Sequence, residues 1–174
     1  WDISQHYAKT WKGTGFKGQV TASGKREALI LKRYLDLYGK VTSEVLISGP
    51  DEREGLGDTS DDANVQVFWQ QMMTKYGNEK EYNRSLIESF KDGENPEIII
   101  VVDKLLTGFD APRNVVLYIA RSLKDHTLLQ AIARVNRLCN GKDYGYIIDY
   151  YGVIANLHSA LELYGTLADF DPED

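Results

Sequence analysis

The sequence predicts an α/β domain whose mainly parallel sheet is flanked by helices. Two short apolar runs, EIIIVVD at 97–103 and NVVLYIA at 114–120, are rich in β-branched residues. Such runs are typical of strands that are buried on both faces. Helical patterns separate the strand-like runs along the chain, which favours right-handed crossovers and parallel pairing. The 174 residues are enough for one domain with its own core.

The first part of the chain contains one strand and one helix pattern. Residues 1–15 show no clear period, so we interpret them as a linker or connecting arm. A strand is expected at 16–22 and a helix at about 25–37. Ser23 is suited to cap that helix, and Gly39 is suited to end it. The apolar side chains expected to be buried on this helix are Leu29, Leu31, Tyr34, Leu35 and Tyr38.

The rest of the chain continues the alternation. The acidic, glycine-containing segment 49–62 is expected to be a surface loop. Further strands are expected at 43–48, 97–103, 114–120 and 144–149. Further helices are expected at about 63–76, 79–91, 125–139 and 153–167. The last residues, 169–174, form an acidic tail.

The charge and composition limit the functions that this chain can have. With 26 acidic and 20 basic residues the formal charge is −6, so a contact with nucleic acid must be local or shared with another domain. The single cysteine, Cys139, fits a reducing cytoplasm. The three histidines are scattered, so no metal site is expected. No apolar run approaches the roughly 20 residues that cross a membrane.

Three loops with polar residues are expected to leave the carboxyl ends of strands, where open parallel sheets bind ligands. They are segments 21–27, 103–113 and 122–126. In the second loop, Gly108 permits a close approach to a ligand. Asp110 can accept a hydrogen bond from a sugar hydroxyl or from an arginine. The alternative is that Asp110 only caps a tight turn.

The helix expected at 125–139 has two different sides. Leu128, Ile132, Val135 and Cys139 occupy one side. Gln130, Arg134 and Arg137 lie on roughly the opposite side, where we expect them to have no partner in their own fold. Two forked guanidinium groups can grip phosphate oxygens, although a solvated polar face is the simpler interpretation. The chain has no G-x-x-x-x-G-K-[ST] loop, so it holds half of a nucleotide site at most.

These segments together resemble a known family. DKLLTGFDAP at 103–112, followed by HTLLQAIARVNR at 126–137, is similar to motifs V and VI of superfamily 2 helicases. The sequence of these motifs most resembles that of the motor (R) subunit of type I restriction enzymes. QVTASGKREA at 19–28 stands at the position of motif IV. The resemblance implies a three-layer RecA-like domain at 16–168, the second of two such lobes.

The resemblance also implies roles for individual residues. The lobe would complete the ATP site for ATP-dependent translocation on duplex DNA and for restriction, with ATP and Mg²⁺ held mainly by the first lobe. Arg137 would be the arginine finger and Arg134 its neighbour. Gly108, Asp110 and Gln130 would line the nucleotide. The residues near nucleic acid would be Thr21, Ser23, Lys104 and Thr107.

The partners implied by the resemblance are the first RecA-like lobe and the nuclease domain of the same subunit, the modification and specificity subunits, and double-stranded DNA, in the cytoplasm of a bacterium or archaeon. Val102, Thr107 and Ala133 depart from the general helicase pattern. Two alternatives stay open. One is a non-catalytic protein-docking scaffold with a helicase-lobe fold, and the other is a signalling receiver that is phosphorylated on Asp103.

Overall fold

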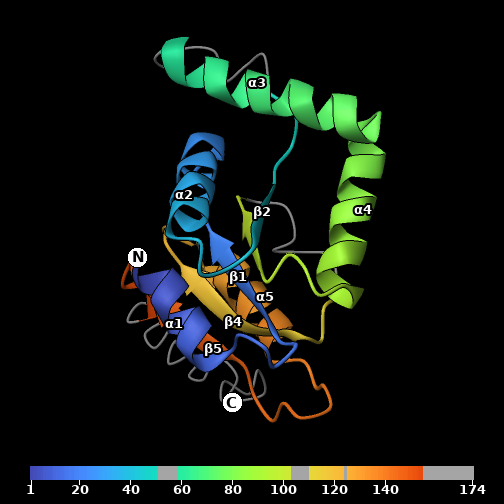
Figure 1. Ribbon diagram of the computed structural model, residues 1–174. Coiled ribbons are helices and arrows are strands. Elements are labelled where there is room, and N and C mark those ends of the chain that lie inside the picture. Colours follow the sequence, from blue (N-terminus) through green and yellow to red (C-terminus); the bar gives the residue numbers. More distant parts are fainter. Residues whose placement is uncertain (51–58, 103–109, 124, 155–174) are drawn as a thin grey trace, which may run out of the picture.

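The computed structural model describes residues 1–50, 59–102, 110–123 and 125–154 (Figure 1). The described helices are α1 (Asp2–Thr10), α2 (Lys25–Tyr38), α3 (Thr59–Tyr76), α4 (Glu79–Asp92) and α5 (Asp125–Val135). The described strands are β1 (Lys17–Thr21), β2 (Ser43–Leu46), β3 (Ile98–Val101), β4 (Asn114–Ile119) and β5 (Tyr146–Asp149). Most of the helix expected at 153–167, and all of the tail, lie outside the described residues.

The five strands form one sheet in the order β2-β3-β1-β4-β5, and every pairing is parallel. The first strand of the chain therefore lies at the centre of the sheet. All residues of β3 and β4 are buried, as their β-branched composition predicts. The predicted α/β class with a mainly parallel sheet is confirmed.

Helices cover both faces of the sheet and make three layers (Figure 1). Residues of α4 and α5, such as Phe90 and Leu128, pack on one face with Leu117 of β4. Residues of α1 and α2, such as Tyr7 and Leu35, pack on the other face with Val20 of β1. Helix α3 lies across the ends of α2 and α4 and contributes side chains to both cores.

Residues 1–15, which were expected to be a linker or connecting arm, contain helix α1, and this helix is docked on the sheet. Tyr7 is fully buried, and its hydroxyl donates a 2.6 Å hydrogen bond to the carbonyl of Phe16. His6 Nδ1 lies 2.8 Å from the hydroxyl of the buried Tyr118 in β4. Only Ser4 and Tyr7 of this helix are buried, so the sequence shows no long apolar period.

Helix α2 follows the prediction at its C-terminus but not at its N-terminus. Gly39 ends it in the left-handed conformation with φ 61°, as expected. The N-cap is Gly24 rather than Ser23. The N–H and O–H groups of Ser23 instead donate to the carboxylate of Glu27. Tyr34 and Tyr38, which were expected in the core, are 53% and 41% exposed.

Two other helices have boundaries that differ from the prediction. Helix α3 begins at Thr59, inside the segment that was expected to be a loop. Helix α5 ends at Val135 instead of Cys139. The segment before β5 passes close to this end of the helix. A Cβ on Gly145 would lie only 2.2 Å from the carbonyl oxygen of Val135. None of the helices in the described part of the chain has the length and apolarity that a bilayer crossing requires.

Candidate functional site

The candidate residues divide into two groups by their place on the sheet. Helix α5 starts after the carboxyl end of β4 and runs back, and its last residue, Val135, meets Gly145 just before β5 begins. Arg134 and Arg137 therefore lie toward the amino ends of the strands, away from Ser23 at the carboxyl end of β1. This corrects the expectation that all candidate residues gather outside the carboxyl ends.

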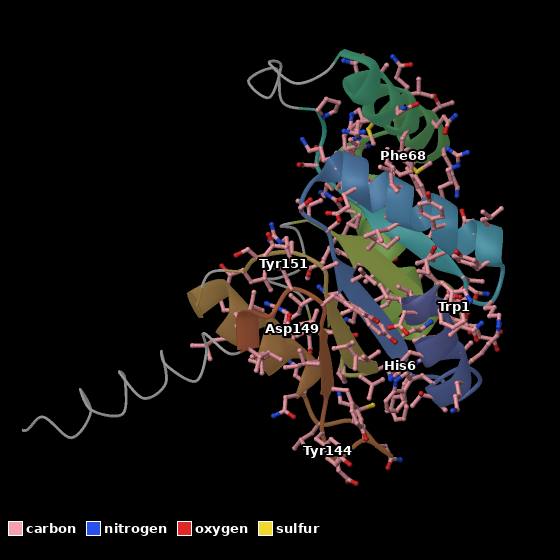
Figure 2. The ribbon with its side chains drawn as sticks, turned by 90° about the vertical axis from the view of Figure 1, so that its left-hand side faces the viewer. Trp1, His6, Phe68, Tyr144, Asp149 and Tyr151 are labelled. Carbon is pink, nitrogen blue, oxygen red and sulfur yellow. The ribbon has the colours of Figure 1, made fainter. Side chains whose placement is uncertain are left out.

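Figure 2 shows the two ends of β5, with Tyr144 just before the strand and with Asp149 and Tyr151 at its other end. Register places Asp149 beside Ile119 of β4, and Ile119 beside Thr21 of β1. The carboxyl ends of three strands thus form one edge. The end of α5 and the approach to β4 belong to the opposite side.

The first group contains an ion pair at the end of α5. A guanidinium nitrogen of Arg137 lies 3.1 Å from a carboxylate oxygen of Asp110, and the two side chains are 48% and 55% exposed. An arginine was one of the two partners expected for Asp110, and this contact is present. The expectation that the arginines have no partner in their own fold is wrong for Arg137. Asp110 is held in place by its neighbour Ala111, which is buried in the core.

Arg134 lies beside this pair and is partly buried. Burial lowers the pKa of Arg134, the positive charge of Arg137 lowers it further, and the carboxylate of Asp110 opposes both effects. Guanidinium groups remain protonated in proteins, so Arg134 keeps its positive charge despite this lowering. Gln130 lies one helical turn before Arg134 and is exposed. Two guanidinium groups near one carboxylate form a donor set that suits a ligand with several anionic oxygens.

The second group lies at the carboxyl end of β1, and its two residues differ. Thr21 is fully buried, and its Oγ1 lies 3.4 Å from the carbonyl oxygen of Tyr118. Its side chain presents no surface to a DNA backbone, which corrects the expectation for this residue. Ser23 is exposed, but its hydroxyl already donates to Glu27. Lys104, Thr107 and Gly108 lie outside the described residues, as does Asp103.

Asp149 is a residue at this edge that the sequence reasoning missed. Its Oδ1 accepts from the N–H groups of Tyr151 at 2.9 Å and Gly152 at 2.8 Å, and its Oδ2 accepts from Ile154 at 2.9 Å. Burial acts to raise the pKa of Asp149, but these backbone hydrogen bonds hold that pKa below its usual value. An acid at the end of a strand, with a glycine three residues later, was the available signal.

Arg113 is a second residue whose role was missed. Its Nε donates to the carbonyl of Gly15 at 2.7 Å. Its Nη1 lies 3.2–3.3 Å from three carbonyl oxygens at the end of α4, those of Lys91, Asp92 and Gly93. The guanidinium therefore ties the entry of β1 to the C-terminus of α4, where a cation is favoured. A lone arginine after a proline gives no sequence signal for this role.

The described residues contain no group of three or more histidine, cysteine, aspartate or glutamate side chains that could hold a metal ion.

A family model and individual relatives both match this chain, and they belong to the same family. The family model described as domain 3 of the type I restriction enzyme subunit R matches residues 43–152. The MjaVIIIP endonuclease subunit of Methanocaldococcus jannaschii is 37% identical over 169 residues, which are 96% of this chain and 17% of that protein. The chain thus spans about a sixth of the length of the curated relatives that it matches.

Solved structures share the fold at low identity. An HsdR subunit fragment from Vibrio vulnificus YJ016 has a TM-score of 0.57 and 19% identity, over 89% of this chain and 27% of that one. Dbp5 of S. cerevisiae, solved bound to RNA and ADP BeF3, has a TM-score of 0.57 and 17% identity, over 93% of this chain and 34% of that one. The predicted RecA-like fold is confirmed by these neighbours.

Proposed function

The chain belongs to the family of type I restriction enzyme R subunits, as their helicase-like domain, and on that premise we propose that it is the second RecA-like lobe of an ATP-driven motor. In this proposal the lobe completes an ATP site whose other half lies on a first lobe of the same subunit. Turnover at that site drives translocation along duplex DNA and leads to restriction.

The observation that carries the proposal is the arrangement of Arg137, Asp110 and Arg134 at the end of α5. The Arg137–Asp110 pair is about half exposed, so an incoming anion can replace the carboxylate without unfolding the site. Exposed ion pairs contribute only about 0–1 kcal/mol, so such a replacement costs little. Arg134 is fixed in the last turn of α5 and adds a second positive charge.

ATP fits this donor set, because a triphosphate supplies the anionic oxygens that two forked guanidinium groups can bind. The bound nucleotide would supply the phosphoryl group that is transferred to water. Arg137 would turn from Asp110 to the phosphates as the finger, and Arg134 would orient them. Asp110, Gly108 and Gln130 would line the nucleotide. Mg²⁺ would be held mainly by the first lobe, as the resemblance to the motor subunits implies.

Nucleic acid would run past the carboxyl ends of the strands, on the other side of the lobe from the arginines. Ser23 is exposed there and is the described residue that best suits a phosphate contact. Thr107 and Lys104 are proposed for the same path on the basis of the motif alone. Glu27, which accepts from Ser23, would have to release it for such a contact.

The proposed partners follow from the same premise. They are the first RecA-like lobe and the nuclease domain of the same subunit, the modification and specificity subunits, and double-stranded DNA. The parent protein would be an ATP-dependent type I deoxyribonuclease and translocase, in the cytoplasm of a bacterium or archaeon. This lobe alone would be inactive, because it lacks the phosphate loop.

The test is the Arg137→Ala substitution in the full subunit. We expect ATP turnover to fall by roughly 10³-fold or more, because the finger stabilises charge on the transferred phosphoryl group. That loss corresponds to about 4 kcal/mol of transition-state stabilisation. ATP binding, measured by equilibrium titration of a fluorescent analogue, should change little.

The matched control is Arg84→Ala. Arg84 is 57% exposed and pairs with Glu81 on α4, so it resembles Arg137 in exposure and partner type. We expect normal turnover from this variant. Normal turnover in Arg137→Ala would remove the finger assignment, and it would favour a non-catalytic docking scaffold with the same fold.

A further inference from the structure

Helix α2 has two apolar sides, although only one of them contacts the sheet. Ala28 and Leu35 are buried against the sheet. On a different side, four large apolar side chains face solvent: Ile30 at 42% exposure, Tyr34 at 53%, Leu37 at 75% and Tyr38 at 41%. Tyr34 lies four residues from both Ile30 and Tyr38 and three residues from Leu37, so the four side chains form one continuous patch along the helix. We call this patch the outer stripe of α2.

The hydrophobic core on this face of the sheet is complete without the outer stripe. The core on this face closes with Leu35 and Ala28, and α3 adds Val65 and Phe68 to it. The solvent side of a helix that covers a sheet is normally polar. Soluble proteins seldom expose a continuous apolar patch unless it binds something. Two tyrosines in the patch strengthen this argument, because tyrosine is enriched among the residues that dominate binding energy.

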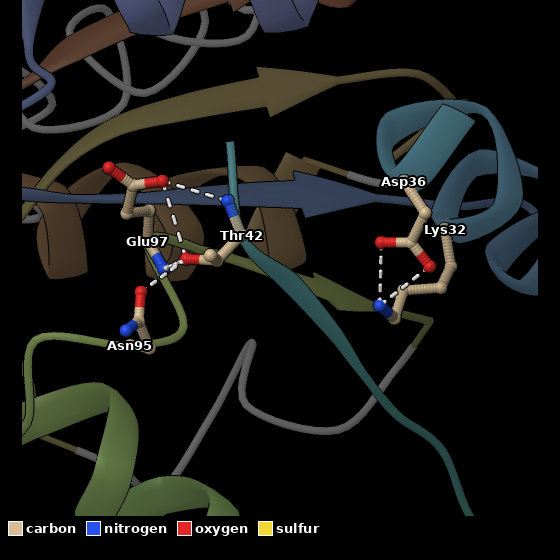
Figure 3. Close-up of polar contacts among 5 residues, drawn as sticks. All are labelled: Lys32, Asp36, Thr42, Asn95 and Glu97. Atoms are coloured by element: carbon tan, nitrogen blue, oxygen red, sulfur yellow. Dashed lines mark hydrogen bonds and ion pairs between the residues drawn. The ribbon is translucent and has the colours of Figure 1, made fainter. Parts of the chain in front are cut away.

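The charges around the outer stripe are unequal. Arg33 lies one helical turn from both Ile30 and Leu37, so it borders the stripe. Lys32 and Asp36 lie on another side of the helix, where they pair with each other at 2.7 Å (Figure 3). The side of the stripe next to Arg33 is therefore basic, and Asp36 is matched by Lys32. Glu27, one turn before Ile30, accepts from Ser23. A partner with an acidic edge complements this border.

We propose that the outer stripe of α2 is the docking surface for an amphipathic helix with an acidic edge, which belongs to a part of the same R subunit outside this chain. The outer stripe has the spacing of helix-on-helix packing, in which side chains at intervals of three and four residues interdigitate. The curated relatives are about six times as long as the stretch that they share with this chain, so most of such a polypeptide lies elsewhere. The proposal rests on family membership and not on the role of Arg137.

The test uses cysteine labelling in the full R subunit, without its partner subunits. Leu37→Cys and Val67→Cys are compared in a Cys139→Ser background, and each labelled site is identified by peptide mass analysis. Val67 of α3 is 52% exposed and lies off the stripe, so it is the matched control. In this lobe Leu37 is the more exposed of the two. Without an occupant, Leu37→Cys should react with a maleimide at least as fast as Val67→Cys.

We expect Leu37→Cys to react at least tenfold more slowly than Val67→Cys, and the ratio to be independent of subunit concentration. Equal rates would overturn the proposal. Protection that disappears on dilution would also overturn it, because the occupant would then be a second copy. Adding Arg33→Glu should raise the rate at Leu37→Cys, and an unchanged rate would contradict the acidic edge. ATP turnover is not part of this readout, so its result is separate from the test of Arg137.

Discussion

Basic side chains toward the amino ends of the strands are held in two different ways. Some are bound to backbone carbonyl oxygens, and Arg137 is bound to a carboxylate. Lys17, Lys142 and Arg113, which we call the carbonyl-bound cations, each donate to two or more backbone carbonyl oxygens. Lys17 is 1% exposed and Lys142 is 5% exposed. The pair formed by Arg137 and Asp110 is about half exposed instead.

The difference shows which charges belong to the fold and which are available to a ligand. A backbone carbonyl in a packed core cannot move away, so a cation bound to it fixes two segments together. Lys142, for example, joins the segment before β5 to Pro112 and Asn114. A half-exposed carboxylate competes weakly with other anions. The carbonyl-bound cations should therefore control stability, and Arg137 should control activity.

The largest effect on stability is expected for Arg113→Met. This change keeps an apolar side chain of similar length but removes the donors to Gly15 and to the end of α4. Hydrogen bonds that involve a charged group contribute about 1.5–3 kcal/mol each, and several of these are long, so we expect a loss of about 2–4 kcal/mol. Urea unfolding of the subunit, followed by a probe in this lobe, measures the loss. Arg84→Met is the control and should cost less than about 1 kcal/mol.

A smaller effect is expected from Lys17, and it depends on pH. Burial lowers the pKa of Lys17 from 10.5 to about 8, and the charge of Arg113 adds to this effect. Between these two values the unfolded chain binds more protons than the folded one, so the free energy of unfolding should rise with pH. The usable window is from pH 8 to about 9.5, below the ordinary tyrosine pKa of about 10.

Comparing the wild type with Lys17→Met across this window tests that expectation. The wild-type stability should rise more steeply than that of the variant, while Lys9→Met, at an exposed position of α1, should keep the wild-type slope. Burial also lowers the pKa of Lys142, so part of the rise should remain in Lys17→Met. Parallel profiles for the wild type and Lys17→Met would show that Lys17 stays fully charged on folding.

The smallest effect is expected for Asp110→Asn. It removes the charge opposite Arg137 and keeps the shape, so the free energy of unfolding should change by less than about 1 kcal/mol. The small difference should shrink further at high salt, because exposed charges are screened. A loss as large as that of Arg113→Met would break the comparison, since it would make the Arg137 pair a structural contact.

The sequence predicted the strands better than it predicted the ends of the helices. Val101 and Ile119 lie in short runs of β-branched residues, which favour buried strands. Tyr34 and Tyr38 sit at helical spacing, but spacing does not show which of two apolar sides meets the sheet. The end of α5 at Val135 depends on Gly145, a contact between distant segments that no local pattern reports.

The contact between Arg137 and Asp110 could be predicted from the sequence, but its place on the sheet could not. The motifs identified Arg137 and Asp110, and their contact follows the prediction for Asp110. The rule that ligands bind at carboxyl ends placed them on the wrong side, because it does not follow the return path of α5. Thr21 was misjudged for a related reason, since the last residue of a central strand is covered by its neighbours.

The position of β1 has a consequence for the order in which the molecule forms. Gly18 pairs with Ile98 on one side and with Val116 on the other. The central strand can therefore pair only after these later segments of the chain have been synthesised. Contacts between such distant segments slow folding and leave the early strand unpaired on the ribosome. Until β4 emerges, a nascent chain would have to keep KGQVT from pairing with other molecules, and chaperones are suited to that task.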